Sequence, residues 1–300
     1  MNQHLSQDSG LTHIPVMITE VLSYLAIQPD GVYLDGTIGS GGHATPVLKE
    51  LTDGGKVVGI DRDEEALDIC KQNLKTSSSF LSLHHNSYAN LDKILAAEGL
   101  SAVHGILLDL GLSSLQLGSK NRGFSYRSEG PLDMRFDQSN GSGAGKLIDQ
   151  ADQDSLAQIF KEYGEERLAS RIAKSIKEMT AMNTIADLRE AIRRCTPPNN
   201  RDRTFARIFQ ALRIAVNEEL DILKQFLTKF IDFLCPGGRI VIISYHSLED
   251  RLVKHSFKEL ASGRSLDILT KRPITAAEQE RKNNRRAGSA KLRAAVKVAL

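Results

Sequence analysis

The feature that most constrains the fold of this chain is an alternation of short apolar segments with helical segments over its first 110 residues. Strands are predicted at residues 32–35, 56–61, 80–84 and 103–110. Between the second and the third, Leu67, Cys70 and Leu74 recur at the spacing of one helix face. Strands separated by helices indicate a parallel, doubly wound α/β sheet, and continuously apolar strands are typical of a sheet covered on both faces.

The pattern changes after Leu110: residues 118–150 are rich in Gly, Ser and charged residues without a clear periodicity, and residues 152–234 then show helical patterns only. A capping-box pattern at Thr184 and Asp187 marks the start of one helix, and a long helix is predicted at about 217–234. An apolar strand then returns at 239–246, and 292–300 is predicted as a final edge strand.

The returning strand decides the predicted domain organisation, because a lone strand needs a sheet to join. We therefore expect one discontinuous α/β domain, residues 1–117 and 216–300, interrupted by an all-helical insertion at 118–215. Two consecutive domains are the alternative.

Composition narrows the function only slightly. The 39 Lys and Arg residues nearly balance the 37 Asp and Glu residues, so bulk charge argues neither for nor against a nucleic-acid partner. The three cysteines show no C-x-x-C spacing, so no zinc site or disulfide framework is expected. No stretch approaches the roughly 20 apolar residues that span a bilayer, and the N-terminus has no signal-peptide pattern. These observations predict a cytoplasmic protein without a membrane partner or a bound metal.

A glycine-rich loop follows the first strand and opens a helix. Its glycines, among them Gly39 and Gly41, let the backbone turn sharply and approach a ligand. Asp61 closes the second strand, where an acid can accept hydrogen bonds from the ribose hydroxyls of an adenosine. With Ala44, the same glycines satisfy the G-x-G-x-x-A dinucleotide fingerprint, so a nicotinamide-dependent oxidoreductase is one hypothesis.

Two further acids favour S-adenosylmethionine as the ligand of this loop. Asp35 directly precedes the glycines, and an anion there would repel a pyrophosphate but attract the ammonium of a methionine moiety. Asp109 ends the fourth strand at the same edge of the sheet, where ligands of open α/β sheets bind. His43 lies inside the loop and is a candidate ligand contact.

Specific motifs continue through the rest of the chain: 13–17 (HIPVM), 109–117 (DLGLSSLQL), 122–126 (RGFSY), 130–135 (GPLDMR), 163–166 (YGEE), 203–205 (RTF), 210–214 (QALRI), 245–251 (YHSLEDR) and 289–293 (SAKLR). With these motifs the chain resembles the bacterial 16S ribosomal RNA cytosine-N4 methyltransferase family over nearly its whole length. It departs from the family pattern at Leu115, at Gly118 and over 284–289.

The resemblance implies a class I, Rossmann-like methyltransferase fold with an inserted helical domain. It also implies S-adenosylmethionine as the donor and, as the substrate, the N4 amine of a cytosine at the decoding site of the small ribosomal subunit. The implied donor contacts are Gly41, Gly42, His43, Asp61, Tyr88, Asp109 and Gln116.

The chemistry of such a transfer needs an acceptor oxygen beside the target amine. The amine of cytosine is a poor nucleophile because its lone pair is delocalised into the ring, and an oxygen that accepts its N–H would localise the pair and stabilise the developing charge. Asp109 is the predicted acceptor, with a backbone carbonyl near Leu110 or Gly111 assisting. Ser113 and His246 are secondary catalytic candidates.

An RNA substrate requires basic residues that contact the backbone and a base that is unstacked to reach the pocket. Residues 189–213 hold seven arginines against two acids, and Arg203, Arg207 and Arg213 are the predicted contacts. Asp133 and Arg135, between the predicted domains, are candidates for positioning the target. A non-catalytic RNA-binding module is a third hypothesis, and the sequence leaves a homodimer open.

Overall fold

The sheet predicted from the alternation is present in the computed structural model, which describes residues 15–299. Its strands are β1 (Val32–Asp35), β2 (Lys56–Asp61), β3 (Leu81–His85), β4 (Val103–Asp109), β5 (Leu234–Ser244), β6 (Leu266–Ile268) and β7 (Lys291–Lys297). The strand order is β3-β2-β1-β4-β5-β7-β6, in which β1 to β5 pair in parallel and β7 runs antiparallel to β5 and β6. The prediction of a mostly parallel, doubly wound sheet is confirmed.

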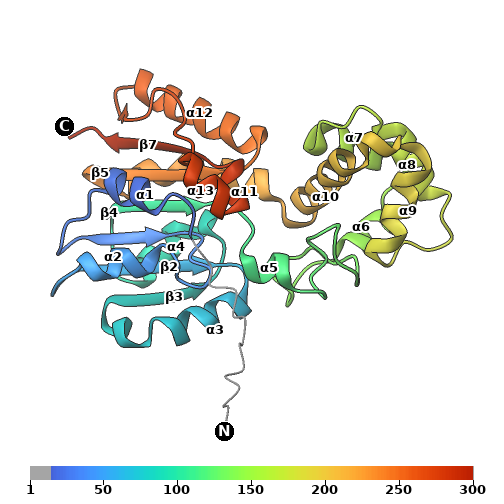
Figure 1. The fold of residues 1–300 in the computed structure, drawn as a ribbon. Helices are drawn as coiled ribbons and strands as arrows, with labels where there is room; N and C mark the ends of the chain where they lie inside the picture. Colours follow the sequence, from blue (N-terminus) through green and yellow to red (C-terminus); the bar gives the residue numbers. More distant parts are fainter. Residues whose placement is uncertain (1–14, 300) are drawn as a thin grey trace, which may run out of the picture.

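Helices cover both faces of this sheet (Figure 1). One face packs against α1 (Ile18–Leu25), α2 (Ala44–Glu50) and α3 (Glu64–Asn73), and the other against α4 (Leu91–Ala97), α11 (Glu219–Lys229) and α12 (Ser247–Ser262). Successive residues of β4 alternate between the two apolar clusters, with Leu107 in the first and Ile106 and Leu108 in the second. Burial on both sides explains why β4 is apolar almost throughout.

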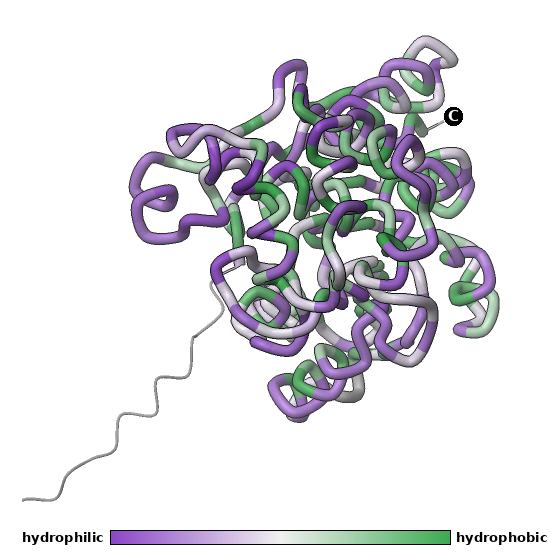
Figure 2. The backbone as a smooth tube through the Cα atoms, turned by 90° about the vertical axis from the view of Figure 1, so that its right-hand side faces the viewer, coloured by the Kyte–Doolittle hydropathy of each residue, from purple (hydrophilic) through white to green (hydrophobic). Residues whose placement is uncertain are grey.

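Several other elements are short. They are α5 (Ser114–Gly118), α13 (Glu278–Asn283) and the 3₁₀ turns η1 (Lys75–Phe80), η2 (Tyr88–Asn90), η3 (Pro198–Asn200), η4 (Phe230–Phe233) and η5 (Arg285–Gly288). Figure 2 shows hydrophilic segments at the outer turns of the chain and hydrophobic segments toward the inside. Within residues 15–299, no helix is long and apolar enough to cross a membrane.

A separate group of helices lies to one side of the sheet (Figure 1). It comprises α6 (Ala144–Gln150), α7 (Gln153–Gly164), α8 (Ala169–Lys177), α9 (Ile185–Cys195) and α10 (Arg201–Asn217). These helices share an apolar cluster that is distinct from the two clusters of the sheet. The capping box is present at the start of α9, where Thr184 and Asp187 each bond to the other's backbone N–H.

Three predicted elements differ from the structure. The helix predicted at 217–234 is shorter: α11 begins at Glu219, because Glu218 has a φ of 52° that separates it from α10, and it ends at Lys229, where the 3₁₀ turn η4 follows. Strand β5 begins at Leu234, before the glycines, and ends before His246. The prediction of a C-terminal edge strand is wrong: β7 lies between β5 and the three-residue β6, which is too short to give a sequence signal.

Candidate functional site

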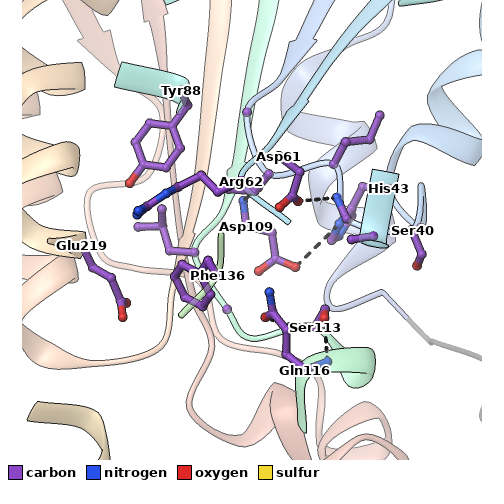
Figure 3. Close-up of a pocket in the computed structure, with 18 of the residues that line it drawn as sticks. Ser40, His43, Asp61, Arg62, Tyr88, Asp109, Ser113, Gln116, Phe136 and Glu219 are labelled. Carbon is purple, nitrogen blue, oxygen red and sulfur yellow. Dashed lines mark hydrogen bonds and ion pairs between the residues drawn. The ribbon is translucent and has the colours of Figure 1, made fainter. Parts of the chain in front are cut away.

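A pocket opens at the carboxyl ends of β1, β2 and β4, and encloses about 940 Å³ including its open mouth. Its lining residues are Gly36, Thr37, Ile38, Gly39, Ser40, Gly42, His43, Asp61, Arg62, Ala66, Tyr88, Asp109, Leu110, Gly111, Ser113, Gln116, Phe136, Glu219, Ile222, Leu223, Glu249 and Arg286. Figure 3 shows side chains from the glycine loop, β2, β4 and α5 converging on it. Parallel strands gather their carboxyl ends at one sheet edge, which brings residues far apart in sequence to one cavity.

The glycine loop is held against the end of β2. Gly39 has a φ of +53° and donates its N–H to Asp61 Oδ2 at 2.8 Å. Gly41 has a φ of +88°, and a Cβ there would lie 2.7 Å from Leu74 Cδ1. Gly39 and Gly42 line the pocket, whereas Gly41 faces α3. Gly41 therefore shapes the loop from behind.

The two acids at the ends of β1 and β2 have different surroundings. Asp35 is 5% exposed and is not among the pocket-lining residues. It accepts the N–H of Thr37 and thereby stabilises the glycine loop from outside the pocket. Burial raises the pKa of Asp35 to about 8. Asp61 lines the pocket, and burial raises its pKa to about 6 against the opposing effect of two backbone N–H donors, Asp63 and Gly39. At neutral pH the acid that faces the pocket is therefore mainly ionised.

Asp109 lies at the centre of the pocket, at the end of β4 (Figure 3). Its Oδ2 is 3.8 Å from His43 Nδ1 and 4.0 Å from Arg286 Nη2, and its Oδ1 is buried without a hydrogen-bond partner among residues 15–299. His43 Nε2 bonds to the carbonyl of Val16 at 2.8 Å, which fixes the ring with Nδ1 toward Asp109. Burial and the charge of Asp109 raise the pKa of the neighbouring Tyr245.

Two residues that line the pocket, Ser113 and Gln116, also form the N-terminal cap of α5. Ser113 Oγ accepts the N–H of Gln116, and Gln116 Oε1 accepts the N–H of Ser113. Gln116 Nε2 also donates to Asp63 Oδ2 at 3.0 Å. Asp63 in turn forms a buried, two-pronged ion pair with Arg122, at 2.7 and 3.3 Å. The hydroxyl of Ser113 is thus engaged in starting α5, and the Asp63–Arg122 pair joins the sheet to the segment that follows β4.

His246 caps α12 and does not line the pocket. Its Nδ1 accepts the N–H of Glu249 at 3.4 Å, which leaves Nε2 protonated in the neutral ring. Nε2 lies 3.1 Å from Glu249 Oε1, and Glu219 also lies within 4.8 Å of this group. Glu219, His246 and Glu249 lie close enough together to bind a metal ion, but the protonated Nε2 has no lone pair for one and Arg213 holds both oxygens of Glu219. These three residues therefore form an internal network of hydrogen bonds and ion pairs. The geometry gives His246 a structural role in place of the predicted catalytic one.

The predicted RNA contacts divide into exposed and internal residues. Arg203 is exposed, and Arg207 is about half exposed, with a side-chain exposure of 47% beside Glu166. The prediction for Arg213 is wrong, because its side chain is only 14% exposed and is held in a bidentate ion pair with Glu219 at 2.8 and 3.0 Å.

Asp133 and Arg135 pair with each other at 2.8 Å. Arg135 also donates to carbonyl oxygens of the same loop, so this pair fixes the loop conformation.

Several pocket residues carry no sequence signal of their own. Phe136 comes from the segment between β4 and α6, Glu219 from the start of α11 and Arg286 from η5. Only their tertiary placement brings them beside the glycine loop. Residues His13 and Ile14 of the first motif lie outside the described residues.

Comparisons with known proteins agree over nearly the full chain. A family model described as the MraW methylase family matches residues 10–298. A protein of Halothermothrix orenii is 44% identical, with 96% of this chain and 99% of that protein covered. One of Kosmotoga olearia is 46% identical, with 96% and 98% covered, and one of Thermotoga neapolitana is 46% identical, with 94% and 95% covered. All three are named Ribosomal RNA small subunit methyltransferase H.

Proposed function

This chain belongs to the MraW methylase family, and from that membership we propose that it transfers the methyl group of S-adenosylmethionine to the N4 amine of a cytosine in 16S ribosomal RNA. The observation that carries the proposal is the identity of 44% and 46%, over nearly the whole chain, to proteins named as methyltransferases of small-subunit ribosomal RNA. The small ribosomal subunit is the proposed partner, and the bacterial cytoplasm the proposed location.

The pocket has the groups that an adenosyl sulfonium donor requires. The carboxylate of Asp61 is held by two backbone N–H groups, and each oxygen keeps a lone pair for a ribose hydroxyl. Tyr88 packs edge-on against Phe226 with ring centroids 5.5 Å apart and forms an aromatic wall suited to the adenine. The glycine loop brings the backbone of Gly39 and Gly42 close to the ligand without a Cβ in the way.

Asp109 is the group best placed to activate the target amine. Its buried Oδ1 accepts no hydrogen bond of good geometry within residues 15–299, although the hydroxyl of Tyr245 lies close to the carboxylate. A desolvated carboxylate oxygen is stabilised when it accepts an N–H. Accepting the N–H of the cytosine amine would localise the nitrogen lone pair toward the donor methyl and would stabilise the positive charge that forms on nitrogen. The proton released after transfer would pass to the same oxygen.

The helices α6 to α10 are the proposed RNA-recognition unit, within the insertion 118–215. Their own apolar cluster supports treating them as a domain distinct from the sheet. Exposed Arg203, with half-exposed Arg207 one turn further along α10, supplies positive charge for RNA phosphates.

The decisive test is the modification state of 16S ribosomal RNA in cells with and without this protein. Mass spectrometry of the nucleosides should find N4-methylated cytidine lost at the decoding site of the deletion strain, and restored when the gene is supplied again. An unchanged nucleoside profile would refute the proposal. Binding of S-adenosylhomocysteine against NADH separates the methyltransferase from an oxidoreductase.

Donor binding is expected to depend on pH through Asp61. Because burial raises the pKa of Asp61 to about 6, its charge is present above that pH and is lost as the pH falls through it. A charged carboxylate accepts ribose hydroxyls more strongly, so S-adenosylhomocysteine should bind about tenfold more weakly at pH 5 than at pH 7.5. Calorimetry over this range measures the effect, and Asp61→Asn should flatten this part of the profile. A wild-type affinity independent of pH would contradict the assignment.

A further inference from the structure

Tyr245 places a buried hydroxyl beside Asp109. It directly follows Ser244, the last residue of β5, and β5 pairs with β4 so that Ile243 lies opposite Asp109. The ring of Tyr245 packs on Gly111, where a Cβ would lie 2.5 Å from Cε2 of the ring. The ring therefore lies across the segment that follows β4, and its hydroxyl is close to the carboxylate of Asp109.

The backbone around Tyr245 is held in place by two hydrogen bonds. The N–H of Tyr245 donates to Oε2 of Glu249 at 2.8 Å, and Glu249 is itself buried in the first turn of α12. Leu110 donates its N–H to the carbonyl of Ile243 at 3.0 Å, which keeps the ends of β4 and β5 together. Tyr245 and Asp109 therefore follow or end two neighbouring strands whose ends are fixed to each other.

The hydroxyl of Tyr245 needs an acceptor. Its oxygen and Oδ1 of Asp109 are both buried, and neither has a hydrogen bond of good geometry within residues 15–299. A buried hydroxyl without a partner is destabilising, and the hydroxyl hydrogen of a tyrosine can rotate toward an acceptor. Burial and the charge of Asp109 raise the pKa of Tyr245, so the phenol keeps its proton and remains a donor.

The other charged neighbours attract Asp109 without fixing its orientation. Oδ2 lies 3.8 Å from His43 Nδ1 and 4.0 Å from Arg286 Nη2, and both distances are longer than a hydrogen bond. An attraction between charges at such distances depends little on the angle of the carboxylate, whereas a hydrogen bond is directional. A hydrogen bond from Tyr245 would supply the direction, and each carboxylate oxygen has a second lone pair that remains for another donor.

We propose that the hydroxyl of Tyr245 donates a hydrogen bond to the carboxylate of Asp109 and holds it in the orientation that accepts the target amine. Tyr245 is thus a positioning residue that acts through Asp109, and it is not among the residues that line the pocket. The inference rests on the proposed function, because it presumes that Asp109 accepts the N–H of the cytosine amine. A group that is oriented in advance need not reorganise during the reaction, so loss of the hydroxyl should slow transfer without weakening binding.

The test is a double-mutant cycle on single-turnover methyl transfer to small ribosomal subunits, at saturating donor and RNA. Tyr245→Phe removes only the hydroxyl and should lower the transfer rate by about tenfold to a hundredfold, the effect of losing a hydrogen bond to a charged group. Calorimetry should find its affinity for S-adenosylhomocysteine within about twofold of the wild-type value. In an Asp109→Ala background, which has no carboxylate to position, adding Tyr245→Phe should change the rate by less than about twofold.

Tyr33→Phe is the matched control. Tyr33 is a buried tyrosine of β1 that does not line the pocket, and its hydroxyl accepts the N–H of Gln28 at 2.6 Å. This variant also loses a hydrogen bond of a tyrosine hydroxyl, but it should keep the wild-type transfer rate.

Two results would overturn the inference and leave the proposed function standing. One is a wild-type rate in Tyr245→Phe, and the other is an equal loss of rate with and without the carboxylate of Asp109, which would indicate a purely structural role. If the wild-type protein does not methylate small ribosomal subunits, the proposed function fails and the inference fails with it.

Discussion

Replacing Asp109 by Asn should lower the rate of methyl transfer by about a hundredfold to a thousandfold at saturating donor and RNA, the size of effect seen when one oriented electrostatic group is removed from an active site. Asn keeps the size of the side chain but removes the negative charge that would stabilise the positive nitrogen. Single-turnover transfer of a labelled methyl group to small ribosomal subunits measures the rate. RNA affinity, measured separately by filter binding, should stay within about twofold, because Asp109 is buried and 9% exposed.

Ser113→Ala is the control for this experiment. Its hydroxyl lines the same pocket but caps α5, so its loss should cost about 1 kcal/mol of stability and leave most of the transfer rate. Transfer at the wild-type rate in Asp109→Asn would show that another group activates the amine. No transfer by the wild-type protein, with RNA binding intact, would favour a non-catalytic RNA-binding module.

Arg122→Met should lower the free energy of unfolding by about 3–5 kcal/mol, because it leaves the carboxylate of Asp63 buried without its counter-ion. The side chains of both partners are only 3% exposed, so solvent screens the pair little. Arg122 also donates to the carbonyls of Arg135 and Phe136, which tie the segment after β4 to the sheet. Urea denaturation followed by circular dichroism gives the free energy directly.

Arg194→Met is the matched control for this experiment, since its ion pair with Glu190 lies on an exposed helix face and should contribute less than about 0.5 kcal/mol. Adding Asp63→Asn to Arg122→Met removes the uncompensated charge and should restore part of the loss. A loss below about 1 kcal/mol in Arg122→Met would mean that water or nearby groups compensate Asp63.

Local and periodic signals determined much of this fold from the sequence alone. The runs that became β1, β2 and β4 were recognisable because most of their residues are buried on both faces of the sheet, which makes them apolar whichever helices cover them. The capping box at Thr184 and Asp187 was equally predictable, because both of its bonds join residues three apart. Asp61 and Asp109 were found for a related reason: acids at the carboxyl ends of parallel strands must meet at one edge of the sheet.

Only the tertiary structure decided what individual polar side chains face. Arg213 had the charge of an RNA contact, but Glu219 holds it in the interior. His246 and Ser113 had the chemistry of catalytic groups, yet each is occupied in starting a helix. Arg286 gave no signal beyond its charge, although it faces Asp109 across the pocket. The physical reason is that periodicity records whether a position is buried, whereas the direction of a side chain and the identity of its partner depend on contacts between segments far apart in the chain.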